Sequence, residues 1–340
     1  MLTLLCVILI YCNTVKQFCQ YKDLQFVVEN AIIRNNSFIK KHLKGRNIVI
    51  LFGILPIPVL VVITLVAYVF GEMIKCRYSR EEGMGKIYLY TAVVSFVCAA
   101  LILAFSGFSV QCSAGSIFMG VLFGLAFMAM LVSSAAAMRI GPWAYTTVMM
   151  SLATVIPSLS GPVFYGEKIT VMQIAGMIMM CVCFLLSVQK DGTQKKANFL
   201  WVVYSLIASL GMSGIGLLQK AQQSGAHKDE SGMFLFAAFM SAAIVGFVID
   251  KIKRRGEEKS AFGKHNIILC FAAGVATALN HTINLALIGT MDSALFFPLI
   301  SGAELIMITL ASVVFMREKL TIKRWIGLVC GIVATVILCL

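Results

Sequence analysis

The sequence predicts an all-α integral membrane protein with ten transmembrane helices, arranged as two inverted repeats of five helices. Three observations lead to this fold class: the composition, ten long apolar runs and one duplicated segment. Of the 340 residues, 60% are hydrophobic and only 13% are charged, and the mean hydropathy is +0.92. Soluble globular domains carry about 25% charged residues. The composition therefore indicates a chain that lies largely within a lipid bilayer.

Each of the ten apolar runs is long enough to cross a bilayer as a helix, which takes about 20 residues. The runs are continuous and not alternating, and backbone polar groups in hydrocarbon must be bonded internally. This pattern favours helices over a closed β-barrel. The runs cover approximately residues 48–70, 87–106, 115–138, 144–165, 172–189, 198–219, 232–249, 266–289, 293–316 and 324–340.

One segment occurs twice. The string "VFYGEKITVMQIAG" at residues 163–176 returns as "VFMREKLTIKRWIG" at 314–327. Each copy closes the fourth run and opens the fifth run of its half, so residues 48–189 and 198–340 form two copies of a five-helix unit. Because five is an odd number of crossings, the two copies must have opposite orientations in the membrane.

Within each copy, a Glu-Lys pair predicts a tight polar turn, a threonine is placed to cap the next helix, and a glycine one turn later allows close packing. In the first copy the capping residue is Thr170. The turn and packing residues of the repeat motif are Glu167, Lys168, Gly176, Glu318, Lys319 and Gly327.

A family resemblance rests on these paired turns together with two further strings. They are the small-residue third run "GVLFGLAFMAMLVSSAAAMRIGP" and its counterpart in the second half, "AAGVATALNHTINLALIGTMDS". Over about residues 48–340 the chain resembles the drug/metabolite transporter superfamily, and within it the EamA-type carriers with ten helices. The resemblance implies movement of small metabolites or drugs, a central cavity formed by the third, fourth, eighth and ninth helices, and no catalytic residues.

Residues 1–47 depart from this pattern. The first 12 residues are apolar but too few to span a bilayer, and they lack the basic start and the cleavage site of a signal peptide. The stretch after them holds seven Lys or Arg and two acidic residues. It is interpreted either as an amphipathic helix on anionic lipid, as a dispensable tail or as the product of a mis-assigned start codon. We expect removal of residues 2–45 to leave insertion and transport largely intact.

The net charge of +13 is concentrated in the short segments between the apolar runs, which follows the positive-inside rule and requires no nucleic acid partner. The turns after the first, third, fifth, seventh and ninth runs hold 18 Lys or Arg, whereas the other four hold 3. This bias predicts that the first set is cytoplasmic, as is the loop Lys251 to Lys264, and that both termini lie outside. The seven basic residues before the first run argue for the opposite orientation.

Neither a cofactor nor a metal site is expected. The 11 cysteines lie at irregular intervals in or beside apolar runs, where they act as small hydrophobic residues. The chain has no zinc-protease HExxH, no GxSxG, no paired intramembrane aspartates and no nucleotide-binding loop, so an enzyme is not expected. Without a nucleotide-binding loop, transport would run on an ion or substrate gradient.

The candidate binding residues are polar side chains inside apolar runs, because a charge at the bilayer centre costs about 3 kcal/mol on insertion scales. Glu304 lies in the middle of the ninth run and is predicted to bind substrate or a proton, with a structural ion pair as the alternative. Asn280 and Asn284 share one face of the eighth run. They are interpreted equally as substrate ligands or as an interhelical contact. His281 is either a packing residue or a proton relay.

An offset of about 150 residues aligns Asn284 with Ser134, which is the corresponding candidate on the third run. Arg139 and Lys220 stand at helix ends, where their side chains are expected to reach the membrane interface. The sequence thus predicts a multi-pass protein of the cell membrane that moves a small molecule by alternating access, with proton coupling through Glu304 as the expected driving force. The alternative is a membrane-embedded scaffold or sensor without transport activity. The oligomeric state is left open.

Overall fold

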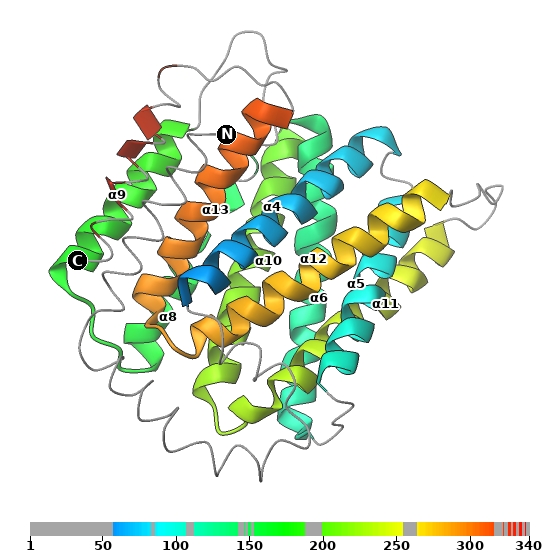
Figure 1. The fold of residues 1–340 in the computed structure, drawn as a ribbon, viewed down its shortest axis with the longest axis horizontal. Helices are drawn as coiled ribbons and strands as arrows, with labels where there is room; N and C mark the ends of the chain where they lie inside the picture. Colours follow the sequence, from blue (N-terminus) through cyan, green and yellow to red (C-terminus); the bar gives the residue numbers. More distant parts are fainter. Residues whose placement is uncertain are drawn as a thin grey trace.

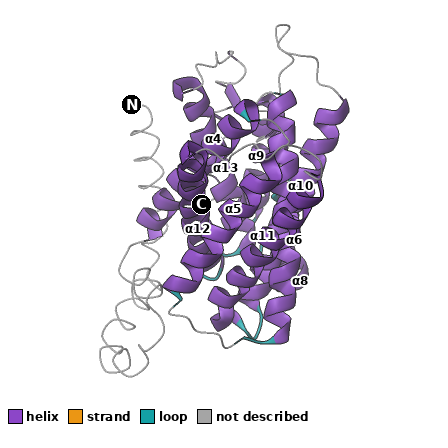
Figure 2. Cartoon of the chain, turned by 90° about the vertical axis from the view of Figure 1, so that its right-hand side faces the viewer, coloured by secondary structure: helices purple, strands orange, loops and turns teal. Residues whose placement is uncertain are grey.

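The computed structural model describes residues 57–82, 86–106, 112–141, 146, 149–150, 153–187, 199–253 and 264–315, and scattered positions between 322 and 337. Every regular element in this part of the chain is helical (Figures 1 and 2). The elements are α4 (Ile57–Glu81), α5 (Ile87–Phe105), α6 (Ala114–Ile140), α8 (Val155–Phe164), α9 (Val171–Ser187), α10 (Phe199–Ser224), η2 (Lys228–Glu230), α11 (Ser231–Lys253), α12 (Lys264–Ile288) and α13 (Ser293–Phe315).

Seven of the described helices are long and apolar enough to cross a membrane: α4, α5, α6, α10, α11, α12 and α13. The all-α prediction is therefore confirmed for the described residues, and the chain is a multi-pass membrane protein. Helix α8 has only 10 residues. The predicted extension at residues 1–47 and most of the tenth run lie outside the described part.

The helices form one bundle in which neighbours in space come from both halves of the chain. Helix α6 packs along α10 and α11, and α5 packs along α11 and α12. Helix α13 contacts α4 and α8, while α4 lies against α12 (Figure 1). The apolar window of α13 is entirely buried inside the protein, whereas at most half of the window is buried in the other six long helices. Helix α13 is thus the most buried of the seven long helices, and the others turn apolar faces outward, where lipid would contact them.

We call the two ends of the bundle the lower and upper ends, after Figure 1. Connections at residues 165–170, 224–230 and 289–292 lie at the lower end, where α6, α9, α11 and α13 begin. Helices α4, α6, α11 and α13 finish at the upper end. By the distribution of basic residues, the upper end is the one predicted to be cytoplasmic.

The first predicted span, 48–70, was placed wrongly at its C-terminal boundary, because α4 continues to Glu81. The extra three turns contain several charges, which the helix accommodates by pairing them along its own surface. Lys75 Nζ lies 2.6 Å from Glu72 Oε1, and Arg77 Nε lies 2.8 Å from Glu81 Oε1. Such i,i+3 and i,i+4 pairs stabilise a helix and here let it continue through a polar segment.

The fourth predicted span, 144–165, is not one continuous helix. A turn at Ala153 and Thr154 precedes α8. The reason is Pro157, which lacks an N–H group and whose ring would collide with the carbonyl of Ala153 in a continuous helix. Two serines of α10 bond carbonyls near this break: Ser209 Oγ donates to Met149 O at 2.9 Å, and Ser213 Oγ donates to Ala153 O at 2.7 Å.

Close approach between helices depends on glycine at a few positions. On α10, a Cβ atom at Gly211 would lie 2.8 Å from both Ala126 O and Met130 Cβ of α6. A Cβ atom at Gly214 on the same helix would find its nearest neighbour, Ala126 Cβ, at an ordinary 3.7 Å. The two helices therefore touch backbone to backbone at Gly211 but leave room at Gly214.

This difference gives a matched pair of variants. Gly211→Ala is expected to lower the free energy of unfolding by about 1–3 kcal/mol, because α6 and α10 must separate to admit the methyl group. Gly214→Ala should be neutral or stabilise by up to about 1 kcal/mol through the helix propensity of alanine. Thermal unfolding of both variants in detergent measures the contrast. Equal midpoints would show that the α6–α10 contact tolerates a wider spacing.

Candidate functional site

A small cavity lies in the middle of the bundle between the two halves of the chain. Its volume is about 80 Å³, and its walls come from α4, α5, α6, α10, α12 and α13, with Met150 ahead of α8. A water molecule needs about 10–15 Å³ by this kind of measure, so the space suits a small solute or several waters. Polar side chains in the walls include Tyr68, Glu72, Lys75, Gln219, His281 and Glu304.

Glu304 is the middle residue of α13 and lines this cavity. It is 5% exposed, and its carboxylate has no hydrogen bond or ion pair to any described residue. A second carboxylate, that of Glu72 on α4, lines the same cavity, as does Tyr68 of the same helix. A buried carboxylate without a partner is costly, which makes Glu304 the strongest candidate for a ligand or proton site.

Glu72 and Lys75 form a buried ion pair and line the cavity together with Glu304, although neither is among the candidates predicted from the sequence. Lys75 Nζ donates to Glu72 Oε1 at 2.6 Å and to Ser134 Oγ at 3.0 Å. Glu72 Oε2 is buried and has no partner. Ser134, the predicted counterpart of Asn284, therefore bonds to Lys75, which lines the cavity, but does not line the cavity itself.

Asn280 and Asn284 line the cavity and also join α12 to α4 through one threonine. Asn280 Nδ2 donates to Thr64 Oγ1 at 3.0 Å and to Thr64 O at 3.2 Å. Thr64 Oγ1 lies 3.3 Å from Asn284 Oδ1, to which it donates. Thr64 is therefore the partner that an interhelical contact of the two asparagines requires. Both amide groups also line the cavity.

His281 lines the cavity from α12 and is surrounded by aromatic rings. Its ring centroid lies 5.6, 5.5 and 5.2 Å from those of Phe123, Phe127 and Phe239. Its Nδ1 atom is buried without a hydrogen-bond partner. The histidine is therefore packed by its ring faces and edges while its polar edge has an unused nitrogen, a geometry compatible with either sequence interpretation.

At the lower end of the bundle, Glu167 joins three elements. Its carboxylate forms an ion pair with Lys220 of α10 and accepts a hydrogen bond of 2.7 Å from the backbone N–H of Ser293, at the start of α13. The side chains of Glu167 and Lys220 are 11% and 7% exposed. Lys220 is thus a buried, paired cation, and the expectation that it reaches the membrane interface was wrong. The physical reason is the carboxylate that the repeat turn places beside it.

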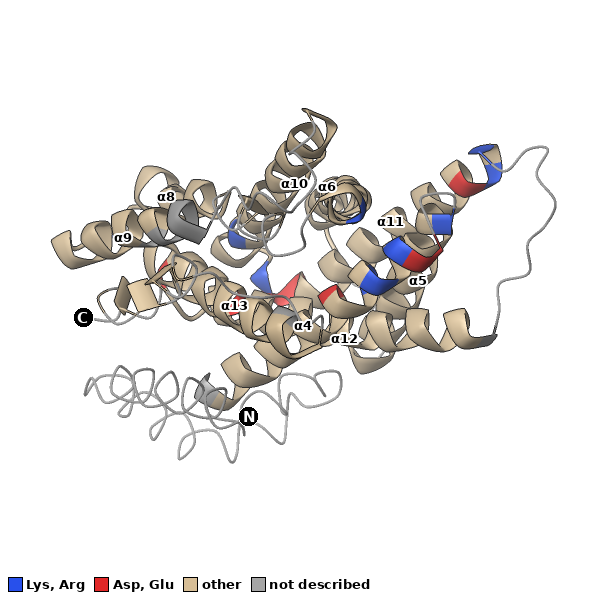
Figure 3. Ribbon diagram, turned by 90° about the horizontal axis from the view of Figure 1, so that it is seen from above, with Lys and Arg blue, Asp and Glu red and all other residues tan. Residues whose placement is uncertain are grey.

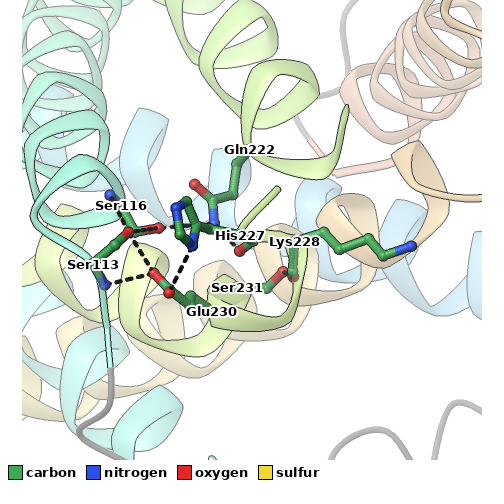
Figure 4. Close-up of polar contacts among 7 residues, drawn as sticks. All are labelled: Ser113, Ser116, Gln222, His227, Lys228, Glu230 and Ser231. Carbon is green, nitrogen blue, oxygen red and sulfur yellow. Dashed lines mark hydrogen bonds and ion pairs between the residues drawn. The ribbon is translucent and has the colours of Figure 1, made fainter. Parts of the chain in front are cut away.

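A second carboxylate binds the start of α6 at the same end (Figure 4). Glu230 Oε2 accepts hydrogen bonds of 2.8 Å from the N–H and the Oγ of Ser113, and His227 Nδ1 lies 3.0 Å from Glu230 Oε1. Gln222 Nε2 donates to the carbonyl of His227 at 2.8 Å. The lower end is therefore held together by two carboxylates, each bonded to the first N–H of a neighbouring membrane helix.

The repeat-motif residues have different surroundings. Thr170 caps α9 as predicted, because its Oγ1 accepts from Gln173 N–H at 3.1 Å while Gln173 Oε1 accepts from Thr170 N–H at 3.0 Å. Lys168 is exposed, and Gly176 and Gly327 are buried. Glu318 and Lys319 lie outside the described residues.

The charged groups fall into few places in the described chain. Figure 3 shows Lys, Arg, Asp and Glu mainly near helix ends, with a small group in the middle of the bundle. Glu72 and Lys75 escaped the sequence analysis because they follow the most apolar part of α4 and were assigned to a loop. Their i,i+3 spacing was the signal that would have placed them on one helix face.

Comparisons with known proteins give the fold and no identity. No family model matches the chain, and no curated protein matches it in sequence. In three dimensions, 28 chains of solved structures match it. One, described only as "Crystal structure of protein", has a TM-score of 0.63 and 14% identity, covering 82% of this chain and 95% of that chain. At this identity the likeness shows a shared helical-bundle fold alone.

Proposed function

We propose that this chain is a secondary carrier of the EamA type, which moves a small organic solute across the cell membrane by alternating access. The observation that carries the proposal is the cavity around Glu304. It lies at the middle of the membrane helices, between the two halves, and combines apolar walls with a few buried polar groups. Sites of this kind, near the midplane at a repeat interface, are typical of secondary transporters.

The helix contacts also support two inverted repeats. If α4, α5, α6 and α8 correspond to α10, α11, α12 and α13, the main contacts between these helices have an observed counterpart. The α6–α10 contact corresponds to α12–α4, α6–α11 to α12–α5, and α8–α10 to α13–α4. The α5–α11 and α8–α13 contacts correspond to themselves. A two-fold pattern of this sort is the arrangement that inverted-topology carriers use to build two gates around one site.

The polar contacts around the cavity suggest where the gates lie. Glu167 and Glu230 connect helices at the lower end, and the Glu167–Lys220 pair there is buried, whereas the Lys253–Tyr88 contact at the upper end is exposed. The cavity wall extends from Lys75 and Tyr90, toward the upper end, to Gln219, toward the lower end. We infer a conformation secured at the lower end, in which the solute site faces the upper, cytoplasmic side. Opening toward the other side would then require the Glu167 and Glu230 contacts to separate.

The test is transport by the purified, full-length chain in proteoliposomes. A growth screen of cells with and without the gene, using metabolites and toxic analogues, supplies candidate solutes. We expect at least one labelled candidate to enter proteoliposomes faster than protein-free liposomes, and unlabelled solute inside to accelerate its entry, as exchange on a carrier requires. A chain that gives no flux and no exchange with the whole panel would favour a scaffold or sensor.

A further inference from the structure

The cavity holds an unequal number of acidic and basic groups. Among the described residues that line it, the side chains that carry full charges are two acids, Glu72 and Glu304, and one base, Lys75. When all three are ionised, the cavity has one negative charge more than positive. A ligand that enters a water-poor site must compensate this charge, because uncompensated charges inside a protein are strongly unfavourable.

Lys75 forms an ion pair with only one of the two acids, Glu72. Its ammonium group lies 2.6 Å from Glu72 Oε1, one turn away on the same helix, and donates to Ser134 Oγ at 3.0 Å from the other side. The lysine side chain is 4% exposed. Glu304, by contrast, has neither a hydrogen bond nor an ion pair within the described chain. The unpaired negative charge therefore belongs to Glu304, and Lys75 determines that it is a single charge.

We propose that Lys75 sets the charge of the solute, so that the cavity selects small organic cations with one positive charge. This inference rests on the proposed carrier function and specifies its substrate class. The ammonium group of the solute binds Glu304, with the rings of Tyr68, Tyr90 and Phe127 nearby to interact with the cation. Its apolar part contacts aliphatic and methionine side chains such as Val94, Met130, Met212 and Ile215.

The same charges explain which solutes are rejected. A dication would bring a second ammonium group into a cavity whose second carboxylate is already paired with Lys75. A zwitterion would place its own carboxylate near Glu304 and Glu72, and like charges in a low-dielectric site repel strongly. A neutral alcohol would leave Glu304 without a counter-charge. Lys75 is thus a specificity-determining residue that acts through Glu72.

The experiment measures equilibrium binding of four probes with equal numbers of heavy atoms: 1-pentanol, pentylammonium, 1,4-diaminobutane and β-alanine. They differ in charge but little in size. Titration calorimetry on the purified chain in nanodiscs gives their affinities without any need for transport. We expect the wild-type chain to bind pentylammonium at least about tenfold more tightly than the other three, since one ion pair in a partly buried site is worth that much.

Three variants test the charge rule. Lys75→Gln leaves two unpaired carboxylates and should shift the preference to 1,4-diaminobutane by at least about tenfold. The double variant Glu72→Gln/Lys75→Gln removes one charge of each sign, keeps polar side chains at both positions and should shift the preference back to pentylammonium. Glu304→Gln should abolish the preference for any cation. If Lys75→Gln does not fold, Glu72→Gln replaces it: Lys75 then balances Glu304, and the preference for any cation should be lost.

The outcomes separate this inference from the carrier function. A wild-type preference for β-alanine or 1-pentanol, an absence of charge-dependent binding, or a double variant that still prefers the diamine would overturn the role of Lys75. Charge-selective binding as predicted, without flux in proteoliposomes, would retain the binding rule and refute the carrier. Flux of a neutral or anionic solute would retain the carrier and refute the binding rule.

Discussion

Glu304→Gln is expected to reduce transport driven by a pH gradient at least about tenfold, while the protein still folds. Glutamine keeps the shape of the side chain but can neither ionise nor carry a proton, so coupling through this residue is lost. The described titratable groups that share the cavity with Glu304 include Glu72 and Tyr68 of α4, His281 of α12, and Lys75, which is bound to Glu72. None of these is free to replace a carboxylate on α13.

The measurement is solute flux in proteoliposomes with an imposed pH gradient, using the solute found in the growth screen. Exchange of labelled for unlabelled solute need not move a proton, so it should survive better than gradient-driven flux. Glu81→Gln is the matched control, because Glu81 lies at the end of α4 with a 53% exposed side chain paired to Arg77. Wild-type flux with an unchanged pH dependence in Glu304→Gln would reduce Glu304 to a packing residue.

Glu167→Gln is expected to lower the free energy of unfolding by about 3–5 kcal/mol, which is the usual cost of removing one partner of a buried ion pair. The substitution leaves the ammonium group of Lys220, 7% exposed, without its counter-charge. It also weakens the hydrogen bond from Ser293 N–H at the start of α13, because an amide oxygen accepts less strongly than a carboxylate.

A double variant separates the ion pair from its surroundings. Glu167→Gln/Lys220→Met removes both charges, so it should recover most of the lost stability in thermal unfolding experiments. Glu82→Gln serves as the control: Glu82 pairs with Lys86 at 2.5 Å, but both side chains are more than one-fifth exposed, and such pairs are worth at most about 1 kcal/mol. If the double variant were as unstable as Glu167→Gln, the Lys220 charge would not be the cause.

The same variants report on the proposed gate. Because Glu167 connects the turn after α8 with α10 and α13, its loss should favour opening at the lower end. A cysteine placed at Gln219, which lines the cavity near Lys220, should then react faster with an impermeant thiol reagent. An unchanged reaction rate in Glu167→Gln would mean that other contacts, such as those of Glu230, hold this end.

The sequence by itself determined the helical class, the membrane setting and the order of the helices. These depend on local properties: runs of apolar residues require a bilayer, and hydrocarbon requires helices. Seven of the ten predicted spans correspond to long apolar helices, and the cap at Thr170 followed from a four-residue motif. Glu304 stood out because a charge within an apolar run is conspicuous without any knowledge of its neighbours.

Only the tertiary structure decided which polar groups meet. Lys220 and Glu167 are 53 positions apart, and nothing in either local sequence indicates that the repeat turn reaches α10 and α13. In the sequence Glu72 and Lys75 resemble loop residues, but α4 continues to Glu81, so both line the same cavity as Glu304 and Lys75 bonds to Ser134. The physical reason is that a charge alters a hydropathy pattern in the same way whether it is solvated in a loop or paired in the core. Whether the charged residue lies in a loop or in the core depends on its ion-pair partner, which comes from another helix or from the next turn of the same helix.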